Sequence, residues 1–153
     1  MYFAIREMPL TLVDGKERGS YIRKVIINGK MKYYIAGYID PGAHNTVVGE
    51  AIMGFVTGDY SIDYNSIVFD EITGYLDYKS VYTPKVAFVH THPDCDCHYG
   101  SDFSDEDLFL SDVIKFFYND ENAKMYLVAT DGNLYRVNYV DGKQVVETVG
   151  MYK

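Results

Sequence analysis

Two histidines in a short motif have the residue type and the spacing that suit metal binding. His90 and His92 belong to a His-Thr-His-Pro sequence at residues 90–93. Successive side chains on a strand point to opposite faces, so both imidazoles leave the same face. Two imidazoles a few ångströms apart suit a first-row metal ion. The motif therefore predicts a pair of metal ligands at the end of a strand.

Asp107 is the third candidate ligand, in the first turn of a helix that we expect to begin after Ser104. It heads an apolar stripe that continues through Leu110, Ile114 and Phe117. A carboxylate in this position points toward the core, where a buried charge needs a partner such as a divalent cation. Three protein ligands leave a fourth position for water, which is the arrangement of a catalytic zinc. We therefore expect one Zn²⁺ ion.

Each motif taken alone has an ordinary explanation. An isolated His-x-His on a strand is usually a surface feature or a hydrogen-bonded pair, and Ser-x-x-Asp at a helix start is usually a capping box. The two motifs in succession are better explained as a metal site. A buried strand, a short loop and a helix start would bring three ligands together from adjacent elements.

In this combination the residues resemble the JAMM (MPN-type) metallopeptidases, whose signature is an upstream glutamate, then His-x-His-Pro, then Ser-x-x-Asp. Residues 84–110 carry the resemblance, and they are most similar to the bacterial JAB-like branch found beside toxin and phage modules. It implies a JAMM-like (cytidine-deaminase-like) core, zinc on His90, His92 and Asp107, and a role for Ser104 in steadying a tetrahedral intermediate. The loop before Ser104 is longer here than is usual in the family.

The resemblance also implies a glutamate that takes a proton from the zinc-bound water and delivers it to the leaving amine. We favour Glu17, which directly precedes the first expected hairpin. Glu50, which is followed by apolar residues and a glycine, is the alternative, and Glu71 has less to recommend it. Any single glutamate is more often a solvated surface charge.

The activity implied is hydrolysis of an amide bond in a peptide or an isopeptide-linked protein. A ubiquitin-like conjugate, a peptidoglycan cross-link and a toxin-associated polypeptide all stay open as substrates. Two rivals remain: an inactive JAMM-like scaffold that binds a partner, and a metal-dependent binding module without a glutamate in reach.

A second group of potential ligands, Cys95, Cys97 and His98, follows the metal motif. They could hold a second metal or place a thiolate on the zinc, because sulfur suits zinc. We favour the simpler interpretation, a loop with free thiols. His44 is interpreted as a surface residue.

Turn chemistry predicts most of the strands. Asn28-Gly29, Asp131-Gly132 and Asp141-Gly142 are hairpin signals, because such pairs tolerate positive φ. The strands expected around them cover residues 21–27, 31–38, 125–130, 134–139 and 144–149. Asp40-Pro41-Gly42 is expected to end the second strand.

The histidines follow a continuous apolar run at residues 85–89, which is typical of a strand buried on both faces. The clearest helix runs from Ser104 to the Asn119-Asp120 pair, with acidic residues in its first turn. Residues 66–78 favour a strand over 66–69, while 47–58 stay undecided between strand and helix. We predict an α+β fold, a mixed sheet with hairpins and one firm helix.

Composition limits the classes of protein. The 153 residues fit one domain over 1–153, and 48% hydrophobic with 24% charged residues is typical of a globular protein. A net charge of −8 argues against nucleic acid and anionic membranes as partners. No apolar run approaches the ~20 residues of a membrane span, and charge enters the N-terminus too early for a secretory signal. We expect a cytoplasmic protein. The sequence does not determine its oligomeric state.

Overall fold

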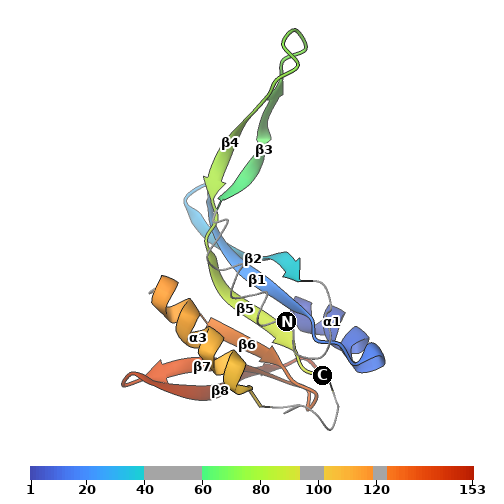
Figure 1. Cartoon of the computed structure of the whole chain (residues 1–153), viewed down its shortest axis with the longest axis vertical. Coiled ribbons are helices and arrows are strands. Elements are labelled where there is room, and N and C mark those ends of the chain that lie inside the picture. Colours follow the sequence, from blue (N-terminus) through green and yellow to red (C-terminus); the bar gives the residue numbers. More distant parts are fainter. Residues whose placement is uncertain (40–59, 94–101, 119–123) are drawn as a thin grey trace.

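The computed structural model describes residues 1–39, 60–93, 102–118 and 124–153 (Figure 1). In chain order its helices and strands are α1 (Tyr2–Asp14), β1 (Gly19–Ile27), β2 (Lys30–Ile39), β3 (Tyr60–Phe69), β4 (Leu76–Tyr82), β5 (Lys85–Thr91), α3 (Asp105–Tyr118), β6 (Lys124–Val128), β7 (Asn133–Val140) and β8 (Lys143–Met151). No helix in these ranges is long and apolar enough to cross a membrane.

Six strands form one mixed sheet in the order β2-β1-β5-β6-β7-β8. β5 and β6 are parallel, whereas the other neighbours are antiparallel. A parallel pair needs a crossover connection, and α3 lies within the one between β5 and β6. The predicted α+β class with a mixed sheet is confirmed.

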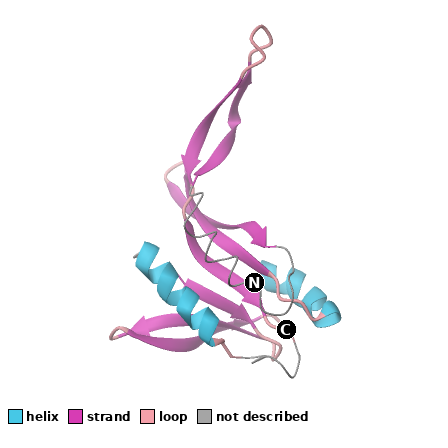
Figure 2. Cartoon of the chain, in the orientation of Figure 1, coloured by secondary structure: helices cyan, strands magenta, loops and turns pink. Residues whose placement is uncertain are grey.

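The two described helices cover opposite faces of this sheet (Figure 2). Phe88 and Val89 are neighbours on β5 and therefore point to opposite faces. Phe88 packs in a cluster with Leu110 of α3, and Val89 packs in a second cluster with Phe3 of α1. The buried strand expected at 85–89 is confirmed, since every residue of β5 is buried.

The turns expected from their sequences are also present. Asn28 and Gly29 have φ of 51° and 73°, and Asp141 and Gly142 have φ of 51° and 76°, the positive values that tight hairpins require. The hairpin of β6 and β7 turns through Gly132 at φ 93°. The strands and α3 agree with the predicted ranges within a few residues.

Helix α1 was not predicted, because the first element was expected to be the β1–β2 hairpin. The helix contains Pro9 and has no side-chain cap at Met1, so the usual signals of a helix start are missing, although Gly15 ends it in the left-handed conformation at φ 68°. What stabilises it is tertiary packing of a buried face, formed by Phe3, Ala4, Glu7, Met8 and Thr11.

β3 and β4 form a separate two-stranded sheet that projects from the body (Figure 1); we call it the arm. The strand preferred at residues 66–69 is confirmed within β3, although the hairpin itself was not expected. Several predictions lie outside the described residues: the turn at 40–42, the segment 47–58, His44, Glu50, Cys95, Cys97 and His98.

Candidate metal centre

The centre lies where β5 ends and α3 begins. His90 is in β5 and points to the α3 face, because it shares the alternation of Phe88. His92 follows the strand, and its N–H donates to the carbonyl of Val128 at 3.3 Å. Asp107 stands in the first turn of α3. Strand alternation and helix position therefore aim all three side chains at one point.

The nitrogen and oxygen atoms of these side chains converge closely. His90 Nε2 lies 3.0 Å from His92 Nε2 and 3.1 Å from Asp107 Oδ1, and His92 Nε2 lies 3.2 Å from Asp107 Oδ2. Two atoms that each lie about 2.0–2.1 Å from a tetrahedral zinc are about 3.3 Å apart. The observed separations are close to that value, so this buried group could hold a metal ion.

Hydrogen bonding fixes which nitrogen of His90 faces the centre. Its Nδ1 lies 3.1 Å from the carbonyl oxygen of Tyr126, which can only accept, so Nδ1 carries the proton. In the neutral ring Nε2 then presents a lone pair toward Asp107. A carbonyl behind the ring is the usual way in which proteins orient a metal-binding histidine.

Asp107 also caps α3. Its Oδ2 accepts the N–H of Ser104 at 2.8 Å, and the Oγ of Ser104 accepts the N–H of Asp107 at 3.2 Å. Asp107 Oδ1 is buried and makes no hydrogen bond among the described residues, although it touches His90. The capping box therefore leaves one carboxylate oxygen for a cation.

Burial and charge shift the acid strength of these groups. The side chains of His90 and Asp107 are fully buried, and that of His92 is nearly so. Burial raises the pKa of Asp107, but the neighbouring His90 and His92 more than offset this, and its pKa falls below the usual range. Burial lowers the pKa of His90, and Asp107 reverses the effect, so that it is raised. A proton or a cation must lie between these groups to balance the buried charge.

Glu17 joins the centre from the segment just before β1. The register pairs Gly19 with His90 and Tyr21 with Phe88, so Glu17, two residues before Gly19, lies on the same face as the histidines. Its Oε1 is 3.7 Å from His92 Nε2, and the residue is 4% exposed. Burial raises the pKa of Glu17 to about 7, against the opposing effect of His90.

Arg18, next in the chain, holds this backbone from the other face. Thr91 donates its N–H to the Arg18 carbonyl at 2.9 Å, and the Arg18 N–H donates to Thr91 Oγ1 at 3.0 Å. Thr11 of α1 bonds the same hydroxyl at 2.7 Å, while the guanidinium binds both oxygens of Asp14 at 2.9 and 2.6 Å. Sequence reasoning missed this network, because it depends on α1.

The structure thus brings together His90, His92, Asp107 and Glu17, with Ser104 bonded to Asp107. Glu71 is instead exposed near the tip of the arm. The chain matches no protein-family model, and searches of curated proteins and of solved structures find no match either.

Proposed function

We propose that this chain is a zinc-dependent hydrolase of amide bonds with a JAMM-like core, in which His90, His92 and Asp107 hold the metal. The observation that carries the proposal is the buried Glu17, whose carboxylate lies 3.7 Å from a candidate ligand atom. A metal site that also holds a buried carboxylate outside its ligand set has the parts needed to activate water.

When bound, zinc lowers the pKa of its water to about 7 and polarises a carbonyl oxygen. Glu17 accepts the proton of the attacking water and then donates it to the leaving amine, which is general base and general acid catalysis by one group. A base works best when its pKa is near the working pH, and burial raises the pKa of Glu17 to about 7. A nearby cation would favour the ionised carboxylate.

Ser104 contributes a hydrogen-bond donor. Its Oγ already accepts the N–H of Asp107, so its hydroxyl proton is available to another acceptor. In the proposed reaction this proton stabilises the developing oxyanion of the substrate, as oxyanion holes do. The substrate class is a peptide or an isopeptide-linked protein.

The zinc content of two aspartate variants tests the metal assignment. Asp107→Asn removes the charge of a buried candidate ligand, whereas Asp105→Asn makes the same change at an exposed position of the same helical turn. We expect about one zinc per chain in the wild type and in Asp105→Asn, measured by elemental analysis after reconstitution and gel filtration, and less than a tenth of that in Asp107→Asn. Wild-type protein that stays free of zinc would overturn the proposal.

The burial of the centre favours one alternative, a structural metal site without catalysis. His90, His92, Asp107 and Glu17 are each at most 4% exposed. A structural site holds its metal through four protein ligands and supports folding, whereas a catalytic site keeps one position for water. After cobalt substitution, the visible spectrum distinguishes the two, since an added small anion perturbs a site with an open position and leaves a closed one unchanged.

A further inference from the structure

The arm has two chemically different faces. Residues directly opposite each other on paired strands share a face, and β4 alternates regularly from Leu76 to Tyr82. The register pairs Phe69 with Leu76, Ile62 with Ser80 and Tyr60 with Tyr82. One face of the arm, which we call the aromatic face, therefore carries Tyr60, Ile62, Phe69, Leu76, Tyr78 and Tyr82.

The opposite face is more polar. It carries two pairs of opposite residues, Asp63 with Lys79 and Val68 with Asp77. An antiparallel sheet with one apolar and one polar face normally packs the apolar face against something. Here the aromatic face lies in water, since its six side chains are between 40% and 66% exposed.

A two-stranded sheet with such a face is marginal by itself. Its six large side chains present roughly 600 Å² to water, if each is taken as about 200 Å² when fully exposed. Exposed apolar patches of several hundred Å² on soluble proteins usually mark contact surfaces. The exposed apolar area therefore indicates that a partner binds the aromatic face of the arm.

We infer that this partner is a second copy of the chain, whose arm packs face to face against the first in a twofold-symmetric dimer. Two aromatic faces together would bury roughly 1,200 Å², which reaches the lower end of the 1,200–2,000 Å² found in stable interfaces. A twofold axis joins a surface to itself, so a single self-complementary face is sufficient. The contact therefore requires no other apolar surface on the protein.

Charge sets the relative direction of the two arms. The tip carries Asp70 and Glu71, with Asp77 close behind, and Glu71 is exposed. Parallel arms would bring the two acidic tips together, whereas antiparallel arms keep them apart.

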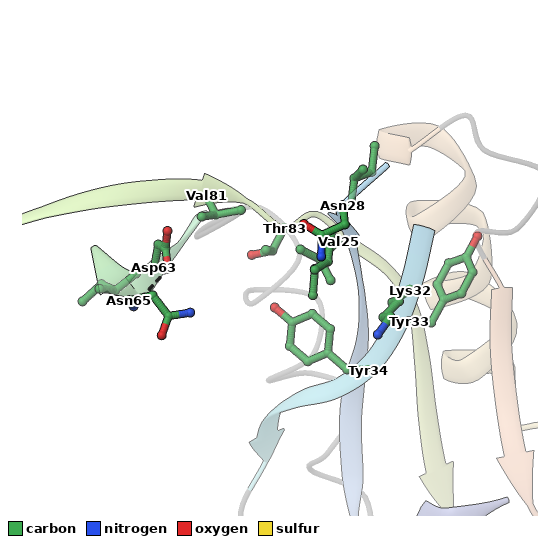
Figure 3. Close-up of a pocket in the computed structure, with 12 residues that line it drawn as sticks. Val25, Asn28, Lys32, Tyr33, Tyr34, Asp63, Asn65, Val81 and Thr83 are labelled. Carbon is green, nitrogen blue, oxygen red and sulfur yellow. Dashed lines mark hydrogen bonds between the residues drawn. The ribbon is translucent and has the colours of Figure 1, made fainter. Parts of the chain in front are cut away.

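The base of the arm and the β1–β2 hairpin are held near each other in the same chain. A cavity of about 660 Å³ lies between them, and Lys32 and Asn28 on one side face Asp63 and Asn65 on the other (Figure 3). Arg23 also donates from its guanidinium to the carbonyl of Thr83 at 2.8 Å. Since Asp63 belongs to the polar face, the hairpin lies on that side of the arm, away from the aromatic face.

Two neighbouring substitutions test the contact. Phe69→Lys places a charge on the aromatic face, and Val68→Lys places the same charge on the opposite face, at 59% and 63% exposed positions. We expect sedimentation equilibrium to give a dimer for the wild type and for Val68→Lys, with a dissociation constant raised at least tenfold by Phe69→Lys. Tyr78→Lys should repeat the effect, and circular dichroism verifies that each variant is folded.

Charge reversal tests the direction. Glu71→Lys should change the dissociation constant of the dimer by less than about threefold, because antiparallel arms keep the two tips apart. A wild type that stays monomeric at about 100 µM overturns the inference, as does a dimer that Phe69→Lys leaves intact. If Glu71→Lys strengthens the dimer severalfold, the tips lie together and the antiparallel arrangement is wrong. Dimerisation of His92→Ala at wild-type strength would show that the arm contact is independent of the metal centre.

Discussion

Asp107 can serve both as a helix cap and as a metal ligand, two roles that a sequence pattern usually presents as alternatives. Its Oδ2 completes a capping box with Ser104, and its Oδ1 faces His90 without a hydrogen bond of its own. A carboxylate has about four lone-pair positions, so one group can serve the helix and a cation together. The helix end thereby fixes the direction of the proposed ligand.

Glu17→Gln tests the proposed base. Glutamine keeps the size of the side chain but cannot take a proton, so zinc binding should persist while hydrolysis of a quenched fluorescent peptide or isopeptide library falls by about 10²–10⁴-fold. The wild-type rate should fall as the pH drops through the pKa of Glu17, because only the ionised carboxylate accepts a proton. The control is Glu71→Gln at an exposed site near the tip of the arm. An active Glu17→Gln enzyme would exclude Glu17 as the base.

At the scale of elements, α1 and α3 pack against opposite faces of the same strands. α3 brings Asp107 to the histidines, whereas α1 fixes the backbone beside Glu17 through Thr11, Thr91 and Arg18. Thr91 lies between the two histidines and points the other way, so the strand that carries the candidate ligands is also the one that α1 holds. Displacement of α1 should therefore disturb both Glu17 and the two histidines.

Asp14→Asn tests the attachment of α1. Arg18 lowers the pKa of Asp14 to about 2 against about 3.9 in an unfolded chain, so its contribution to stability is present above pH 4 and lost as the pH falls through 2. Because Asp14 is 37% exposed, we expect a loss of about 0.5–1 kcal/mol at pH 7 by urea denaturation, and a smaller loss at pH 3. Asp141→Asn, in an exposed turn, is the control. A loss that does not change with pH would contradict the ion pair.

At the scale of the whole molecule, two apolar clusters on the two faces of the sheet form the hydrophobic core. One cluster joins α3 to β5, β6 and β7 through residues such as Phe88, Leu127 and Val137, and a second joins α1 to the other face. A chain of this length buries roughly two-thirds of its unfolded surface. The centre lies at the edge of the first cluster, where His90 stacks on Phe88 with ring centroids 6.0 Å apart.

Metal removal should therefore leave the protein folded. Treatment with a chelator should keep the far-ultraviolet circular dichroism spectrum and a cooperative thermal transition, while added zinc should raise the melting temperature, because it binds the folded state. His92→Ala should abolish that rise without abolishing the transition. Unfolding on chelation would favour the structural metal site over the catalytic one.

Local chemistry made much of this protein predictable from its sequence. Asn28-Gly29 and Asp141-Gly142 adopt the positive φ values that define their turns, and these turns set the register of their hairpins. Strand alternation placed His90 and His92 on one face, and the acidic start of α3 placed Asp107 in its first turn. Each of these inferences depends on residues that are neighbours in the chain.

What the sequence could not decide depends on contacts between distant residues. α1 has an internal proline and no side-chain cap at its start, and it is stabilised by the packing of its buried face, the bond between Thr11 and Thr91 and the pairing of Asp14 with Arg18. Between Glu17 and Glu71, no local pattern separates a buried carboxylate from an exposed one. The antiparallel pairing of β1 with β5 brings Glu17 to the histidines, because a sheet register joins residues more than seventy positions apart.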